Sequence, residues 1–209
     1  MRCRSRFQCC CHKQEGKHIL VSREIEPDEI CIRCLLHPLM KQNNTKLRNT
    51  TVLPPKGENG VSVLRLRYCD EEFAVKHGKS LKVGNNVFWG LAEFTQKIVD
   101  STNNWAQSDL SKADGIEGVN GIEAYIEYKP MINDREYVSE EKDVFLDDPD
   151  IKLPMHAELI YPVDYTQEVQ TKLRNYANEL IKRIKYNLVD DSGGLTEWRQ
   201  SEQFEKYNA

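Results

Sequence analysis

Residues 164–188 read DYTQEVQTKLRNYANELIKRIKYNL and carry the clearest structural pattern in the chain. Apolar residues recur there at helical spacing and form one stripe: Val169, Leu173, Tyr176, Ala177, Leu180, Ile181 and Ile184. Asp164 followed by Gln167 resembles a capping box at a helix start. Glu179 and Arg183 form an acid-first pair four residues apart, which also favours a helix. We therefore predict one long amphipathic helix over 164–188.

Alternating segments earlier in the chain predict strands. The segment VSVLRLRY, residues 61–68, places Leu64 and Leu66 on one face and Arg65 and Arg67 on the other, as in a half-buried strand. The remaining predicted elements are strands at 122–128 and 154–162 and helices at 70–78 and 88–99.

The segment ICIRCLL, residues 30–36, fits either a strand or a helix. Because strands and helices mix without a regular βαβ order, we predict an α+β fold. Its mixed or antiparallel sheet would be packed by the long C-terminal helix. We expect a Cys-rich basic arm at 1–17, a single α+β domain at 18–189 and a polar C-terminal tail at 190–209.

Composition limits the classes of function. The 209 residues have a net charge of −4, so no global positive field would draw the protein to nucleic acid. Charge is uneven, because residues 1–52 hold ten Lys/Arg against five Asp/Glu while residues 133–150 hold eight Asp/Glu against two Lys/Arg. The sequence shows no apolar run long enough for a membrane helix and no secretory signal. We expect a cytoplasmic protein that does not bind membranes.

Six of the seven cysteines and three of the five histidines lie within the first 37 residues. Cys31 and Cys34 have the spacing of a zinc knuckle. Four ligands could be completed by Cys9, Cys10, Cys11 or His12, among which we choose Cys9 and Cys11. If 30–36 is a strand, however, Cys31 and Cys34 point to opposite faces and cannot bind one ion together. A buried Cys34 with a solvated thiol arm is therefore the preferred interpretation, and zinc is the alternative.

Two histidines are candidate catalytic groups. His156 and Glu158 lie two residues apart on one face of a predicted strand, and His37 precedes a proline. An imidazole beside a carboxylate can perform acid–base catalysis or bind a metal. The alternative is structural, with His156 hydrogen-bonded to the backbone and Glu158 in solvent.

A possible anion-binding set follows the loop PPKGENG, residues 54–60. Arg65 and Arg67 would project from the next strand, with Lys56 nearby in the loop, and Ser62 is a further binding candidate. Guanidinium groups bind phosphate through paired hydrogen bonds. A polar outer face of the sheet is the alternative. The sequence contains no Walker loop, GxGxxG, GxSxG, HExxH or kinase motif.

Three short motifs carry a family resemblance: Cys34-Leu35-Leu36-His37-Pro38, then LPPKGENGVSVLR at 53–65, then PMHAELIY at 154–161. Together they resemble a widespread group of small bacterial proteins with an HP, (L/V)SV and PxHA(D/E)I pattern and no established activity. The resemblance spans about residues 18–185 and implies a bacterial intracellular domain. It also implies that Cys31 and Cys34 belong to no shared chemistry. The site candidates that it favours are His37, Ser62 and His156.

These features support three hypotheses. The first is an accessory protein that binds another protein, for example in a bacterial multi-gene system for defence or toxin regulation. The second is an enzyme acting on a phosphate-bearing substrate, with Arg65 as the anion clamp and His37 or His156 as acid–base groups. The third is a zinc-stabilised nucleic-acid binder, which the net charge disfavours. An enzyme should gather His37, Arg65 and His156 in one pocket, whereas a binding protein leaves them apart.

Overall fold

The computed structural model describes residues 18–41, 46–55, 57–108, 119, 121–163 and 167–200. Its main strands are β1 (Cys31–His37), β2 (Gly60–Arg65), β3 (Val87–Phe94), β4 (Tyr125–Tyr128), β7 (His156–Ile160), β8 (Lys185–Leu188) and β9 (Arg199–Gln200). A hairpin of β5 (Met131–Asn133) and β6 (Glu136–Tyr137) stands apart, and the helices are α1 (Glu71–Ser80), α2 (Gln96–Gln107), α4 (Gln167–Ile181) and the 3-10 turn η2 (Asn49–Thr51).

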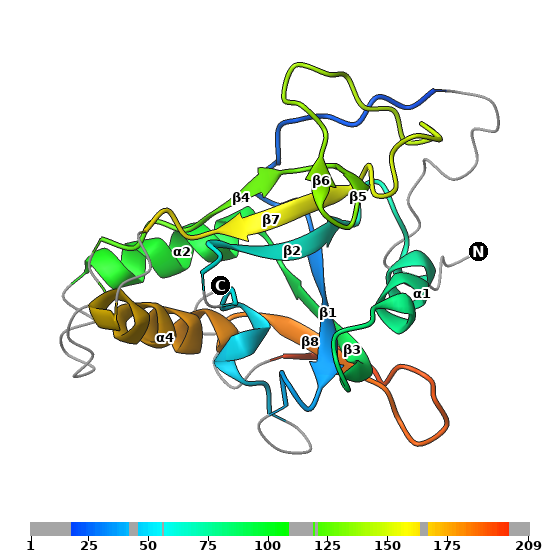
Figure 1. The fold of residues 1–209 in the computed structure, drawn as a ribbon. Coiled ribbons are helices and arrows are strands. Elements are labelled where there is room, and N and C mark those ends of the chain that lie inside the picture. The colour runs from blue at the N-terminus through cyan, green and yellow to red at the C-terminus, as the bar shows by residue number, and fades with distance from the viewer. Residues whose placement is uncertain are drawn as a thin grey trace, which may run out of the picture.

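The main strands form one antiparallel sheet in the order β4-β7-β2-β1-β3-β8-β9 (Figure 1). The predicted α+β class and antiparallel sheet are therefore confirmed, and β9 extends the sheet into the predicted tail. Within the described ranges, none of the helices combines the length and apolar composition needed to span a membrane. The predicted arm at 1–17 lies outside the described residues.

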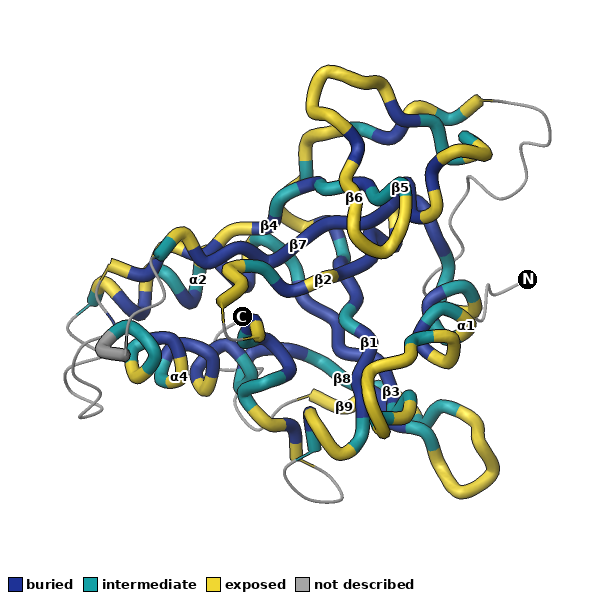
Figure 2. Tube along the Cα trace, viewed as in Figure 1, coloured by how far each residue is buried: buried dark blue, intermediate teal, exposed yellow. Residues whose placement is uncertain are grey.

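Each face of the sheet is covered by its own hydrophobic layer. One layer holds α2 and α4, which lie side by side in Figure 1, and includes Phe94 and Leu173. The other layer holds α1 and the long connections around β5 and β6, and includes Ala74 and Leu153. The middle strands are consequently buried along most of their length, as the dark tube in Figure 2 shows.

β1 resolves the ambiguity at residues 30–36 in favour of a strand. Cys31 and Leu35 lie in the layer of α2 and α4, whereas Ile32 and Cys34 lie in the layer of α1. This alternation follows from the two-residue period of a strand. Gly78 fits closely over this strand, because a Cβ there would come 2.4 Å from the Phe88 ring and 3.2 Å from the Cys34 sulfur.

The predicted helix over 164–188 is correct only in part. α4 ends at Ile181, and β8 then pairs with β3. The last helical turn tightens, since Lys182 and Arg183 donate backbone N–H groups three residues back. Ile184 and Leu188 continue the apolar stripe, but Ile184 directly precedes β8 and Leu188 is its last residue. Both are buried in the layer of α2 and α4. The predicted cap at Asp164 lies outside the described residues.

The predicted helix over 88–99 is wrong. Residues Val87–Phe94 form β3, and α2 begins afterwards with Thr95 as its N-cap, whose hydroxyl accepts a hydrogen bond from Ile98 N at 3.3 Å. Both faces of β3 are covered, so its apolar run lacks the alternation that identifies a half-buried strand. At Gly90 a Cβ would lie 2.1 Å from the Asn187 carbonyl oxygen. The close pairing of β8 with β3 therefore requires a glycine at this position of β3.

We predict that Leu173→Ala and Leu180→Ala each lower the free energy of unfolding by about 2–5 kcal/mol, because both side chains are buried against the sheet. Urea denaturation followed by circular dichroism measures the loss. Asn178→Ala, on the exposed side of the same helix, is the matched control and should change stability by less than about 0.5 kcal/mol. Equal effects at all three positions would contradict the assigned packing of α4.

Candidate functional site

The structure does not bring His37, Arg65 and His156 together. His37 ends β1, whereas Arg65 pairs in register with Cys31 at the other end of that strand. Six residues of strand separate these positions by roughly 20 Å, at about 3.3 Å per residue. His156 pairs with Leu64, so its side chain leaves the sheet on the face opposite to Arg65. The predicted shared cleft is therefore wrong.

Arg65 is a structural residue and not an anion clamp. Its fully buried guanidinium donates to both carboxylate oxygens of Glu29, at 2.5 and 2.8 Å, and to the carbonyl oxygens of Ser22 and Glu24. Although burial acts to lower it, the hydrogen bond and charge of Glu29 raise the pKa of Arg65. These partners occupy the donors that an anion would need.

The other members of the predicted anion set do not converge either. Arg67 is exposed beyond the end of β2, with its guanidinium 5.7 Å from the Tyr68 ring. Ser62 is exposed in the middle of β2, and its carbonyl oxygen accepts a hydrogen bond from Arg33 at 2.8 Å. Lys56 lies outside the described residues.

His156 is buried and bound to the backbone. Its Nδ1 lies 2.5 Å from the Lys129 carbonyl oxygen, and a carbonyl can only accept, so Nδ1 carries the proton. Nε2 is then the acceptor, and it has no hydrogen-bond partner in the part of the chain that the structure describes. Burial lowers the pKa of His156, with the charges of His77 and Arg33 acting in the same direction. This backbone hydrogen bond matches the structural alternative for His156, but Glu158 is buried and not in solvent as that alternative expected.

Glu158 is the centre of a polar cluster rather than a partner of His156. Its carboxylate accepts a hydrogen bond from the Tyr137 hydroxyl at 2.6 Å and lies 3.5 Å from the Lys129 ammonium. Glu127 faces it from the neighbouring strand and shares the same lysine at 3.1 Å. At Gly60 a Cβ would come 2.6 Å from the Glu158 carboxylate, so the backbone there closes on this group.

This cluster lines a polar cleft of about 500 Å³, formed by the loop before β2, the middle of β7, the residue after β4 and the β5–β6 hairpin. Burial raises the pKa of Tyr137, and the bonded Glu158 carboxylate raises it further. Burial lowers the pKa of Lys129, but Glu127 and Glu158 more than reverse that effect. Tyr137 and Lys129 therefore keep their protons near neutral pH. The cluster fixes the hairpin to the sheet.

The cysteine pair cannot bind one metal ion. Cys31 and Cys34 are buried on opposite faces of β1, and burial raises the pKa of each thiol to about 12. Within the described ranges no group of three or more His, Cys, Asp or Glu side chains could hold a metal. The zinc site that joins Cys31 to Cys34 is therefore wrong, while Cys9 and Cys11 lie outside the described residues.

Exposed apolar side chains that the sequence-based predictions do not include lie at the far end of β1. Leu39, Val83 and Val87 are 40%, 43% and 61% exposed, and we call these three residues the apolar patch. Two loops build it and are joined directly, because Leu39 N donates to the Asn86 side-chain oxygen at 3.2 Å. The Leu39 carbonyl accepts from the Thr50 hydroxyl at 2.7 Å, so the backbone of Leu39 is held on both sides.

Aromatic and cationic groups border the apolar patch. His37 pairs with Val87, and its ring lies 6.3 Å from the half-buried Trp89 ring. The Lys41 ammonium lies 5.8 Å from the same indole. One signal was present in the sequence, since VGNNV at 83–87 is a turn former flanked by two valines that a tight turn leaves in solvent.

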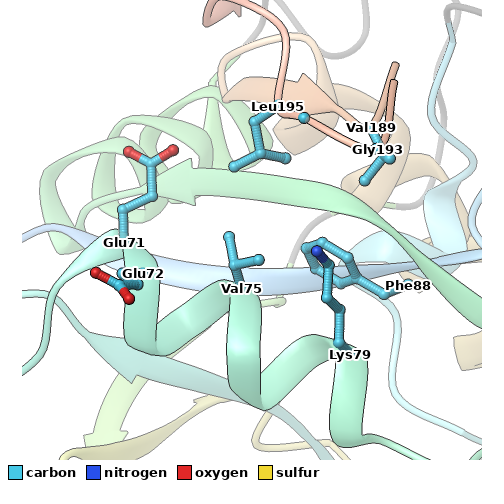
Figure 3. A pocket seen from close by; sticks show the side chains of 9 residues that line it. Glu71, Glu72, Val75, Lys79, Phe88, Val189, Gly193 and Leu195 are labelled. Atoms are coloured by element: carbon cyan, nitrogen blue, oxygen red, sulfur yellow. The ribbon is translucent and has the colours of Figure 1, made fainter. Parts of the chain in front are cut away.

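A separate groove of about 360 Å³ opens between α1 and the loop after β8 (Figure 3). Val75 and Leu195 face one another across it, with Glu71 at one end and Lys79 beside Phe88 at the other. The groove is apolar in its middle and charged at its ends. It holds none of the site residues that the sequence predicts.

No protein-family model, curated protein sequence or solved structure matches this chain. Function must therefore be inferred from the geometry of the chain itself.

We predict that Glu29→Ala lowers the free energy of unfolding by about 3–5 kcal/mol, because it leaves the Arg65 guanidinium buried without a carboxylate. Asp28→Ala is the matched control: its carboxylate is exposed and forms only a 3.6 Å surface pair with Lys97, which contributes about 0–1 kcal/mol. Denaturant titrations of both variants at pH 7 compare them. Similar losses would show that the buried pair does not hold this region.

We predict that stability falls as the pH drops below about 6.5, the ordinary pKa of histidine. The pKa of His156 is lowered in the folded state, so the unfolded chain binds the proton more tightly and acid favours unfolding. His156→Asn retains an amide donor for the Lys129 carbonyl and should flatten this dependence in urea titrations between pH 7.5 and 5. His77, whose pKa burial also lowers, will keep part of the slope. An unchanged slope in the variant would contradict this assignment.

Proposed function

We propose that this protein acts by binding another protein, and that the apolar patch is the contact surface. The observation that carries the proposal is the patch itself, three exposed aliphatic side chains on two loops that hydrogen bonds already join. A surface that is ordered before contact loses little conformational entropy on binding. An exposed apolar cluster with a polar border is characteristic of a recognition site.

The size of the patch indicates a modest contact. Full burial of an aliphatic side chain contributes about 1.5–3 kcal/mol, so three half-exposed ones would contribute roughly 3 kcal/mol together. The Trp89 ring beside them can add an aromatic anchor of the kind that dominates many interfaces. The apolar part alone would give weak binding, so the partner must supply further interactions.

The charges around the patch indicate the chemistry of that partner. The stretches of sequence that include the patch residues, 37–53 and 76–89, contain six Lys/Arg and no Asp or Glu: Lys41, Lys46, Arg48, Lys76, Lys79 and Lys82. An acidic protein segment that carries an aliphatic side chain would match both features. Charge complementarity of this kind increases the association rate and selects the partner.

The competing hypotheses have less support. His37, Arg65 and His156 are dispersed, which the enzyme hypothesis does not predict. The Tyr137–Glu158–Lys129 cluster lies in a cleft, but the pKa values of Tyr137 and Lys129 are both raised away from neutral. A nucleic-acid binder would need the cations but would not need exposed leucine and valine beside them.

We predict that a probe peptide with one leucine flanked by glutamates binds this surface. In a titration followed by ¹H–¹⁵N NMR, the largest shifts should fall on the amides of Leu39, Val83 and Val87. The double change Leu39→Ser and Val87→Ser should weaken binding at least tenfold, because it removes two of the aliphatic contacts.

Tyr125→Ser is the matched control for this titration, because Tyr125 is similarly exposed on the edge strand β4. A peptide in which lysines replace the glutamates tests the charge. Shifts that are spread over other surfaces, or equal binding by the patch variant and the control, would contradict the proposal. A single-stranded oligonucleotide that shifts the same amides more strongly than the acidic peptide would favour nucleic acid instead.

A further inference from the structure

We infer that the protein segment that fits the apolar patch belongs to a second copy of this chain, so that the protein assembles head to tail. This inference rests on the proposed function and specifies its partner. The candidate segment is an acidic lobe made of residues 18–30 and 131–153. These two stretches contain twelve Asp/Glu and four Lys/Arg, and one of the acids, Glu29, is neutralised by Arg65.

The two stretches form one structural unit. Val21 N donates to the Val144 carbonyl at 2.8 Å, and Leu146 N donates to the Ile19 carbonyl at 2.8 Å. The Arg23 guanidinium crosses between them and donates to the Ser139 carbonyl at 3.1 Å. The acids beside these bonds, among them Asp143 and Asp147, therefore lie on a segment that is held against residues 19–23.

The acidic lobe also exposes an aliphatic side chain. Leu20 pairs across the lobe with Phe145 and is 51% exposed. Asp143 and Asp147 are exposed on either side of this pairing. An exposed leucine between carboxylates is the chemistry that complements the apolar patch and its cations.

The positions of the two surfaces favour contact between molecules. The lobe lies where the chain enters β1 at Cys31, and the patch follows His37 at the other end of that strand, roughly 20 Å away at about 3.3 Å per residue (Figure 1). The three patch side chains therefore cannot reach Leu20 of their own chain, although the hairpin end of the lobe lies close enough for Asp134 to act on His77 of α1. When two different surfaces of one protein meet, the contact repeats and gives a ring or an open chain.

The charge balance remains favourable when neighbouring acids are included. Asp190 and Asp191 follow β8, which pairs with β3 beside the patch. Glu71 and Glu72 of α1 line one groove together with Lys79. These four acids reduce the excess of six cations to two, which still opposes the acidic lobe in sign. Attraction between exposed charges is screened within about 8 Å at physiological salt, so the assembly should depend strongly on ionic strength.

Sedimentation velocity of the full chain in reducing buffer tests this assembly. At about 50 mM salt, where screening is weak, the protein should form concentration-dependent species larger than a monomer, and about 0.5 M salt should return it to monomer. The reductant prevents disulfides through the cysteines at 3–11 from joining copies.

Two charge-reversal variants make the test specific. The patch variant combines Arg48→Glu with Lys82→Glu, and the lobe variant combines Asp143→Lys with Asp147→Lys; all four side chains are exposed. Each variant alone should stay monomeric, because like charges now meet at the substituted positions of the contact. Their mixture should assemble again into dimers and larger species, since the intact lobe of one variant meets the intact patch of the other and the two reversed surfaces also carry opposite charges.

Arg174→Glu with Arg199→Glu is the control for the patch variant, with the same change of charge as that variant at exposed positions on α4 and β9. It should assemble as the parent does. If the parent is monomeric at every salt concentration while the acidic peptide still binds the patch, self-assembly is wrong and the proposed function stands. If the peptide does not bind either, the proposed function fails. Assembly that persists in both reversal variants, or a mixture that stays monomeric, would overturn the head-to-tail contact.

Discussion

The buried guanidinium of Arg65 is the constraint on which one half of the molecule depends. A charge removed from water must be paired and hydrogen-bonded, and here the partners are Glu29 and two backbone carbonyls of the same N-terminal segment. The rings of Tyr68 and Tyr128 lie 4.8 and 5.2 Å from the guanidinium carbon and exclude water from it. The segment before β1 lies against the sheet largely because this charge requires its oxygens.

The sheet then acts as a rigid spacer between two ends of different chemistry. Arg65 fixes the acidic end, where two connections pair with each other. At the other end, the hydrogen bonds of Leu39 fix loops that carry cations and aliphatic side chains. The middle strands are buried on both faces, so the variable chemistry lies in the connections, as is usual for binding surfaces. The Glu158 cluster belongs to this framework, because through Tyr137 it attaches the β5–β6 hairpin to β7.

The sequence predicts the helices and strands whose pattern is set by neighbouring residues. It does not show which distant segments pack over them. The α+β class, α1 with its Asp70 cap, and the positions of β2, β4 and β7 follow from spacing and turn residues. The prediction of a helix at β3 is wrong because both faces of this strand are covered. Its sequence therefore lacks the alternation of apolar and polar residues that identifies a strand. The alternation around Arg65 indicates which face it occupies but cannot reveal a carboxylate 36 residues away that makes that face a core. The same limit hid the link between His156 and the backbone of Lys129, 27 residues apart.

Two thiols that are buried on opposite faces of β1 can report on local opening of the fold. Alkylating reagents attack thiolates, and both Cys31 and Cys34 are protonated and enclosed while the sheet is closed. Cys31 lies under the layer of α2 and α4, whereas Cys34 lies under α1. The rate at which each sulfur is modified therefore measures how often its own layer lifts away. Peptide mass mapping can time the two openings separately in the unaltered chain.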